Sequence, residues 1–284
     1  MHTHLRESLA GRRLVTTIAP LSFVEYRQID AAADVSRLYG DFVTFGALPG
    51  LINIPSADEK MGVLEELLAT YIQKDFKSLI REENVRAFNT LLYLLAERQG
   101  SMISVNSLAV EIGLTAAAVT RHLDILENTH VAHSLFSYAR ALGNELKKSR
   151  KIYLYDLGIR NALLRDFSHG DSRQDVEAVH ETFVYLELRK LLKPNRELKL
   201  WRTKAGDEVD FVLFTDRRPL PIEVKSTLNR PEVPKAIIKF LRVYPEAPGA
   251  VVLSTGLRAD AEVNGKPVIF RTLAETAESV SLFG

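Results

Sequence analysis

The sequence predicts a protein of the α/β class, with a mainly helical first half followed by a mixed-sheet second half. Between residues 56 and 126, apolar residues recur every three to four positions, as on one face of a helix. Between residues 198 and 270, short β-prone runs are separated by turn residues and by a helical stretch. The chain has 284 residues, of which 46% are hydrophobic and 26% charged. A globular chain of this length is expected to form about two domains.

The first elements are predicted from β-branched residues and from a helix cap. Residues 14–24 are apolar and β-branched, so we expect a strand that leads into a turn. Residues 31–82 are expected to form a helical segment. Within it, Ser56 and Glu59 form a capping box that opens a helix to about residue 80.

A helix predicted over residues 85–97 precedes a helix-turn-helix pattern. Ser104 can cap a short helix, Gly113 ends that helix in a tight turn, and Thr115 caps a second helix. The sequence therefore predicts a winged helix-turn-helix over residues 83–155. The strands of its wing are expected at residues 131–138 and 151–155.

Residues 156–284 are predicted to form an α/β domain, because strands and helices are mixed there. Helices are expected over residues 178–192 and 234–243. The strands are expected over residues 198–202, 208–214, 221–225, 249–254 and 267–270.

Three polar residues on two of these strands form the candidate site. Because side chains alternate along a strand, Glu223 and Lys225 share one face. A tight turn between the strands could bring Asp210 beside Glu223, with Val209 and Phe211 turned away from Asp210. Two carboxylates and an ammonium would then converge on the surface of the sheet.

This set of groups suits metal-dependent phosphate chemistry. The carboxylates of Asp210 and Glu223 supply hard oxygen ligands for a hydrated Mg²⁺, which can polarise a phosphate oxygen and activate water. Lys225 can orient that water and offset charge in the transition state. Glu181, on the helix upstream, is a candidate further ligand. The alternative is a solvated strand face with a weak surface ion pair.

A basic stretch lies in or beside the predicted wing. Residues 138–165 carry seven basic side chains against two acidic ones, which would suit contacts with nucleic-acid phosphates. A solvated loop is the alternative, and winged helices also bind proteins. The first turn of the recognition helix is three alanines, which argues against strong sequence-specific readout. The candidate nucleic-acid contacts are Arg121, Lys147, Lys148, Arg150 and Lys151.

The composition excludes several classes of protein. The chain has no cysteine, which excludes a disulfide framework, a thiolate zinc site and a cysteine nucleophile. No apolar run approaches the roughly 18 residues of a membrane span, so no membrane contact is expected. The formal net charge is only +1, so any surface that binds nucleic acid must be local. We expect a cytoplasmic protein.

A series of short segments spans nearly the entire chain. These segments are residues 7–12, 19–23, 46–50, 71–75, 106–109, 123–126, 151–158, 181–184, 187–188, 201–203, 208–211 and 222–225. In this order they resemble the C-terminal region of a prokaryotic AAA-type ATP-binding protein family. Members of that family have an ATPase module followed by a domain of unknown function, made of a winged helix and a restriction-endonuclease-like fold.

The resemblance implies roles for the candidate site. It implies that Asp210, Glu223 and Lys225 match the D…E-x-K core of the restriction-endonuclease-like superfamily. It also implies that Glu181 matches the acidic position on a helix of that superfamily.

The resemblance also implies a division into domains. Residues 1–30 would be a remnant of the ATPase domain, and residues 156–284 would be the restriction-endonuclease-like domain. The chain departs from the family because it has no G-x-x-x-x-G-K-[ST] motif, so the P-loop is missing. We therefore expect neither binding nor hydrolysis of ATP.

Two functions follow from these observations. The first is a Mg²⁺-dependent nuclease-like protein that associates with DNA. The second is a non-catalytic regulatory module, in which the nuclease-like fold is a scaffold for a protein partner. The sequence does not set the oligomeric state.

Overall fold

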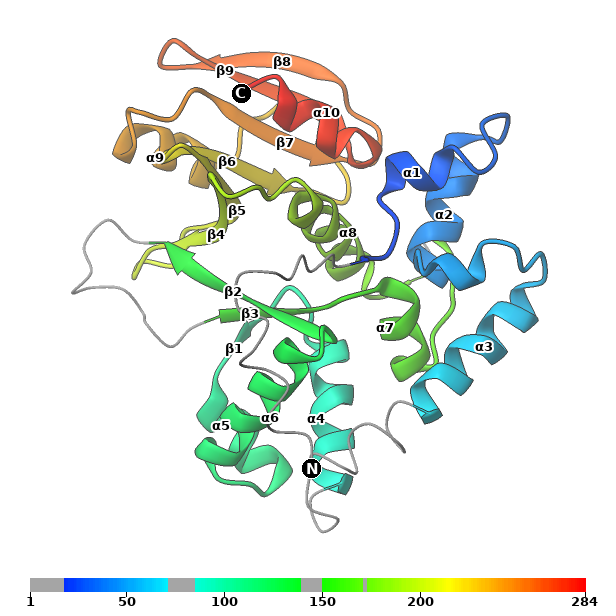
Figure 1. Ribbon diagram of the computed structural model, residues 1–284. Helices are drawn as coiled ribbons and strands as arrows, with labels where there is room; N and C mark the ends of the chain where they lie inside the picture. Colours follow the sequence, from blue (N-terminus) through cyan, green and yellow to red (C-terminus); the bar gives the residue numbers. More distant parts are fainter. Residues whose placement is uncertain (1–17, 71–84, 139–149, 171–172) are drawn as a thin grey trace, which may run out of the picture.

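The computed structural model describes residues 18–70, 85–138, 150–170 and 173–284 (Figure 1). Within these ranges, helices surround a mixed sheet of nine strands, which confirms the predicted α/β class. None of the described helices is long and apolar enough to cross a membrane.

The first described segment is helical where the sequence predicted a strand. Helix α1 (Phe23–Arg27) begins after Ser22, which forms a capping box with Glu25. Residues 18–22 have no regular structure, and residues before 18 lie outside the described ranges. The predicted strand over 14–24 is therefore wrong for the part that is described, because the capping box favours a helix.

Two longer helices follow, α2 (Val35–Phe45) and α3 (Ala57–Thr70), with the 3₁₀ turn η1 (Pro49–Leu51) between them. The predicted cap of α3 is present, since the backbone N–H of Glu59 donates to Ser56 Oγ at 3.4 Å. The expected extension of this helix to residue 80 lies outside the described residues.

The helix-turn-helix elements form as expected. Ser104 Oγ accepts from the backbone N–H of Ser107, and Thr115 Oγ1 accepts from that of Ala118. Gly113 ends the first helix with a left-handed φ of 72°, which glycine adopts without steric cost. The elements here are α4 (Val85–Glu97), β1 (Met102–Ile103), α5 (Val105–Ile112), α6 (Ala116–Asn128), β2 (Ala132–Tyr138) and β3 (Arg150–Leu154).

The described residues after β3 supply four helices and six strands. Helix α7 (Leu157–Leu164) follows β3 directly, and α8 (Val176–Lys190) precedes the remaining strands. Those later elements are β4 (Arg196–Arg202), β5 (Glu208–Thr215), β6 (Arg218–Val224), α9 (Lys235–Val243), β7 (Ala250–Ser254), β8 (Ala259–Val263), β9 (Lys266–Thr272) and α10 (Thr276–Ser281), with a 3₁₀ turn before α10.

One sheet runs through both halves of the chain. Its strand order is β1-β3-β2-β4-β5-β6-β7-β9-β8. The halves join where β2 pairs in parallel with β4, through Ser137 opposite Leu200 and Tyr138 opposite Trp201. The predicted domain boundary at residues 155 and 156 therefore does not interrupt the sheet.

The sheet is covered on both faces. Helix α8 packs on one face through Val179, Phe183 and Val184, and it lies between the sheet and the helical part of the chain (Figure 1). Helix α9 packs on the other face through Ile237 and Phe240. Because α8 lies on the same face as the strand residues Phe211 and Ile222, its polar residues are held close to the ends of β5 and β6.

Two of the segments that carry the family resemblance contact each other. Gly46 has a φ of +76°, and a methyl group added there would lie 2.0 Å from Asp156 Oδ1. Asp156 caps α7 and also accepts from the backbone N–H of Ala47 at 2.8 Å. Glycine at position 46 therefore lets α2 end against the start of α7.

A largely buried group of residues, here called the arginine cluster, ties α8 to α2, α4 and α7. It consists of the buried Arg160, Asn161 and Arg173 and of Asp175, whose side chain is 26% exposed. Asp175 contacts Arg160 Nη1 at 2.6 Å and Arg173 Nε at 2.8 Å. Asn161 Nδ2 donates to the carbonyls of residues 43 and 44, and Arg160 Nε donates to that of residue 96. These bonds link α2, α4, α7 and the start of α8.

Candidate functional site

The hairpin of β5 and β6 brings Asp210 next to the end of β6. The hairpin turns at Asp216 and Arg217, which both have positive φ, and Phe211 pairs with Ile222. Asp210 Oδ2 accepts from the backbone N–H of Val224 at 2.9 Å. Asp210 is thus fixed beside the strand that carries Glu223 and Lys225.

A β-bulge sets the direction of Asp210. Lys199 pairs with Val212 and Trp201 pairs with Val209, so two steps along β4 correspond to three along β5. The extra residue breaks the alternation, and Val209 packs with α9 whereas Phe211 packs with α8. The expectation that Val209 and Phe211 turn to the same side is therefore wrong. Bulges re-aim side chains in this way, and here Asp210 comes within reach of groups on α8 and β3.

Glu223 and Lys225 form an ion pair at the end of β6. Lys225 Nζ lies 2.7 Å from Glu223 Oε1, and the Glu223 side chain is 6% exposed whereas that of Lys225 is 43% exposed. Within the described part of the chain, Glu223 Oε2 is buried and has no hydrogen-bond partner. One oxygen of this carboxylate is therefore left to bind a cation or a proton.

Helix α8 contributes Glu181 to the same place. Glu181 Oε1 accepts from Lys151 Nζ at 2.9 Å and from the Tyr153 hydroxyl at 2.5 Å. The end of α4 is also close, because a methyl group added at Gly100 would lie 3.1 Å from Glu181 Oε2. Three elements therefore meet at one carboxylate.

Lys151 belongs to the candidate site, where the sequence did not place it. It was predicted to contact nucleic acid, but its side chain is only 2% exposed. Its Nζ lies 2.9 Å from Glu181 Oε1, 2.7 Å from Glu208 Oε1 and 3.6 Å from Asp210 Oδ1. The reason is that β3 is paired on both sides, and the face that bears Lys151 and Tyr153 lies against α8.

The other predicted nucleic-acid contacts fall in different places. Arg121 is exposed on α6. Arg150 is 9% exposed, and its Nη1 donates to Ser134 Oγ at 3.1 Å and lies 3.5 Å from Glu127 Oε1. Lys147 and Lys148 lie outside the described residues. Of the described members of this set, only Arg121 has the exposure that a phosphate contact needs.

We use the name acidic cluster for Lys151, Glu181, Glu208, Asp210, Glu223 and Lys225. Burial and the neighbouring Asp210 raise the pKa of Glu181 to about 7, and the same two causes raise the pKa of Glu223 to about 7. Burial alone would lower the pKa of Lys151, but Glu181, Asp210 and Glu208 raise it above its ordinary value. The lysine stays charged, and the buried carboxylates exceed what it can neutralise.

A small cavity of about 140 Å³ opens beside these groups. Acidic residues of α8 face Asp210 and the end of β6 across it. Its lining is Glu177, Glu181, Asp210, Val224, Lys225 and Ser226.

The donor set is compatible with a hard divalent cation, since it offers carboxylate oxygens and the unpartnered Glu223 Oε2. Among the described residues, however, no group of three or more His, Cys, Asp or Glu side chains surrounds a common point as metal ligands would. The geometry gives the reason, because Glu181, Glu208 and Asp210 converge on the Lys151 ammonium instead.

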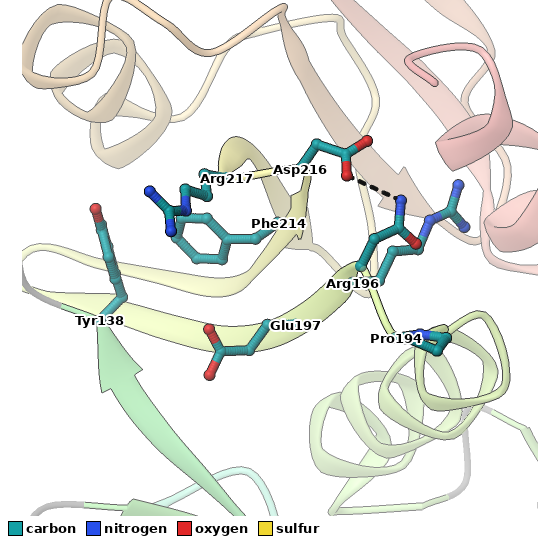
Figure 2. A pocket seen from close by; sticks show the side chains of 8 residues that line it. Tyr138, Pro194, Arg196, Glu197, Phe214, Asp216 and Arg217 are labelled. Carbon is teal, nitrogen blue, oxygen red and sulfur yellow. Dashed lines mark hydrogen bonds between the residues drawn. The ribbon is translucent and has the colours of Figure 1, made fainter.

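A larger hollow, of about 740 Å³, lies elsewhere (Figure 2). It is open, and Tyr138, Phe214 and Arg217 lie on one side of it. Arg196 and Asp216 lie on the other side, and Asp216 Oδ1 accepts from the Asn195 amide at 3.1 Å. Phe214 and Asp216 are at the end of β5 whereas Asp210 is near its start, so this hollow is separate from the acidic cluster.

The alternation of side chains along β3 and β5 could have indicated part of the acidic cluster. Glu208 and Asp210 are two positions apart on β5, as are Lys151 and Tyr153 on β3. Each pair is therefore expected to share a face of its strand. Nothing local indicates that the two faces meet, because β3 and β5 are about 60 residues apart in the chain.

Two families of unknown function match the chain. Residues 36–170 match Domain of unknown function (DUF8612), and residues 176–271 match Domain of unknown function (DUF4143). Lys151 falls in the first match, and Glu181, Asp210, Glu223 and Lys225 fall in the second. The acidic cluster is thus built from both.

Curated relatives are also uncharacterised. The protein Rv2008c of Mycobacterium tuberculosis is 27% identical over 223 residues, which cover 78% of this chain and 48% of that protein. The protein MJ1544 of Methanocaldococcus jannaschii is 25% identical over 240 residues, covering 78% of this chain and 52% of that protein. The chain spans about half the length of the curated relatives it matches.

Among solved structures, the crystal structure of protein VC1899 from Vibrio cholerae is similar to the chain with a TM-score of 0.25 and 14% identity. The match covers 81% of this chain and 56% of that one.

Proposed function

We propose that this chain is a Mg²⁺-dependent, nuclease-like protein that acts on nucleic acid, with its phosphodiester-cleaving site at the acidic cluster. The observation that carries the proposal is that Glu181, Asp210 and Lys225 line one cavity, with Lys225 paired to the buried Glu223. The proposal includes a restriction-endonuclease-like domain related to the C-terminal region of AAA-type ATP-binding proteins. The motif order of the sequence and the mixed sheet support that relation.

The residues divide the chemical work between them. Asp210 and Glu223 would hold the ion, with Glu181 as a further ligand. A bound Mg²⁺ would supply Lewis acidity to a phosphate oxygen and lower the pKa of a bound water. Lys225 has an ammonium that is partly exposed at the cavity, so it can orient the attacking water and offset negative charge on the phosphate.

The winged helix would supply part of the nucleic-acid contact. Arg121 is exposed on the second helix of the helix-turn-helix, where it can reach a phosphate. The first turn of that helix contains only alanines, which favours binding without strong sequence preference. DNA is the partner that we would test first.

The test is cleavage of end-labelled DNA by the purified chain in the presence of Mg²⁺, with Lys225→Ala as the variant. We expect wild-type cleavage that EDTA abolishes and that Lys225→Ala lowers by about 100-fold or more. Lys239→Ala is the matched control, because Lys239 is 42% exposed and pairs with Asp207 in the same way. We expect the control to cleave at the wild-type rate. Equal rates in Lys225→Ala and Lys239→Ala would refute the assignment of Lys225.

One observation favours a second function, a non-catalytic module that binds a protein partner. The Lys151 ammonium already contacts three carboxylates, so much of the acidic cluster is compensated without a metal. This alternative predicts no salt-dependent binding to DNA. Affinity measurements at several salt concentrations separate the two functions, because phosphate contacts make log affinity fall linearly with log salt.

A further inference from the structure

The Lys151 ammonium lies among three carboxylates of the acidic cluster. Its ammonium is held from three directions, by Glu181 on α8 and by Glu208 and Asp210 on β5. The side chain is 2% exposed, and β3 is hydrogen-bonded to strands on both sides. The ammonium is therefore a cation held in place by the fold.

Asp210 divides the cluster into two halves. Its Oδ1 lies 3.6 Å from Lys151 Nζ, and its Oδ2 accepts from the backbone N–H of Val224. On the Val224 side lies Glu223, whose Oε2 is buried and has no partner among the described residues. One oxygen of Asp210 thus faces a permanent cation, and the other is bonded to the end of β6, the strand that carries Glu223.

Sites that hold two metal ions place the ions about 3.5–4 Å apart. A carboxylate between such ions binds one through each oxygen. Asp210 likewise has its two oxygens directed to two different places, but one of them faces the Lys151 ammonium. We propose that Lys151 takes the place of a second divalent ion, so that the acidic cluster binds a single Mg²⁺ on the Asp210–Glu223 side. This inference rests on the proposed function, because it assumes that the cluster binds a divalent ion.

The formal charges agree with one ion. The acidic cluster has four carboxylates and two ammonium groups, which leaves a formal charge of −2. One Mg²⁺ neutralises that charge, whereas a second ion would leave an excess of +2 beside the buried Lys151 and Glu223. The carboxylates are Glu181, Glu208, Asp210 and Glu223, and the cations are Lys151 and Lys225.

The test counts Mn²⁺ ions bound to the intact chain, by native mass spectrometry and by calorimetry. We expect one Mn²⁺ per wild-type chain and one in Lys151→Arg, which keeps the charge. We expect two in Lys151→Met, because three carboxylates lose their cation while the side-chain volume is nearly kept. One Mn²⁺ in Lys151→Met, bound with wild-type affinity, would overturn the inference.

A second variant decides the matter if Lys151→Met fails to fold. Among the described residues, the ion pairs of Glu208 are with Lys151 and Arg202, so Glu208→Gln removes a carboxylate from the Lys151 half. We expect this variant to bind one Mn²⁺ within about threefold of the wild-type affinity. A loss of about tenfold or more would place the ion on the Lys151 side and refute the inference.

The outcomes also separate this inference from the proposed function. Wild-type binding that is lost in the Asp210→Asn/Glu223→Gln double variant supports a metal site, whatever Lys151→Met shows. If the wild type, Lys151→Met and Lys151→Arg all bind no Mn²⁺, the metal site itself is refuted and the inference fails with it. If the wild type and Lys151→Met both bind one ion, only the role of Lys151 is refuted.

Discussion

The arginine cluster and the acidic cluster both bury charged side chains next to α8, but the first has an excess of cations and the second an excess of carboxylates. In the arginine cluster, Asp175 lies between two guanidinium groups, which also donate to backbone carbonyls and to Asn161 Oδ1. Burial alone would raise the pKa of Asp175, but Arg173 and Arg160 lower it to about 2. In the acidic cluster, burial and Asp210 raise the pKa of Glu181 and of Glu223 to about 7.

This difference favours a structural role for the arginine cluster and supports the functional role proposed for the acidic cluster. The arginine cluster meets its own hydrogen-bonding needs, so nothing more has to bind there. The acidic cluster keeps an excess of carboxylates and one buried oxygen without a partner in the described structure. Perturbed carboxyl groups of this kind beside a cavity are typical of functional sites.

The largest effect is expected from breaking the arginine cluster. Arg160→Met removes one guanidinium and leaves the carbonyl of residue 96 without its donor and Asp175 with only Arg173. We expect the free energy of unfolding to fall by about 3–5 kcal/mol, as for other buried ion pairs that lose one partner. Urea unfolding measures the change.

The matched control for that variant is Arg98→Met. Arg98 also makes a bidentate pair, with Glu111, but both side chains are more than a third exposed. We expect a loss below about 1 kcal/mol. Equal losses in the two variants would mean that burial does not distinguish the clusters.

The next effect is a pH dependence in the acidic cluster. Glu181 has its pKa raised from 4.5 to about 7, so the folded state holds a proton that the unfolded chain releases between those values. The contribution of Glu181 is fully present below pH 4.5 and is lost as the pH rises through about 7. Relative to Glu181→Gln, the wild type should therefore lose about 2–3 kcal/mol of unfolding free energy between roughly pH 5 and pH 8.

The difference between the two proteins is the quantity to measure, by urea unfolding at several pH values. Burial lowers the pKa of His133 to about 3, which acts in the opposite direction but equally in both proteins. Glu65→Gln, at an exposed position on α3, should track the wild type at every pH. A constant difference between wild type and Glu181→Gln would show that Glu181 does not titrate in this range.

The smallest effect is expected from removing the Tyr153 hydroxyl. Its hydroxyl donates to Glu181, and that bond lowers the pKa of Glu181. Tyr153→Phe keeps the ring stacked on Tyr185, so we expect a loss of about 1 kcal/mol. It should also move the titration of Glu181 to higher pH, which an NMR titration of side-chain carboxyl carbons would follow. Tyr93→Phe, at an exposed position, should change neither quantity, and a downward shift in Tyr153→Phe would contradict the assignment.

Local signals predicted most of the helices and strands. The caps at Ser104 and Thr115 and the turn at Gly113 are each determined by a few neighbouring residues, and each formed as expected. Helix α1 was missed although Ser22 and Glu25 carry the same capping-box signal as Ser56 and Glu59. The strand was predicted instead from the β-branched residues before Ser22.

The candidate site was predictable only as far as it is local. Asp210, Glu223 and Lys225 lie on adjacent strands joined by a tight turn, so alternation indicated that they would be neighbours. The bulge in β5 and the arrival of Lys151 depend on how β4 and β3 pack, which no local pattern encodes. The parallel pairing of β2 with β4 joins residues more than 60 positions apart, and such contacts are set by the whole fold.

The position of Lys151 has a consequence for how genes of this kind can recombine. The two family matches meet between residues 170 and 176, and a crossover there would look harmless in an alignment. It would nevertheless combine Glu181, Glu208 and Asp210 from one parent with strand β3 from the other. In a chimera, the carboxylates from the second parent keep their buried cation only if the first parent has a lysine at the β3 position that pairs with Leu135 of β2. The two regions must be exchanged together, or matched at that position.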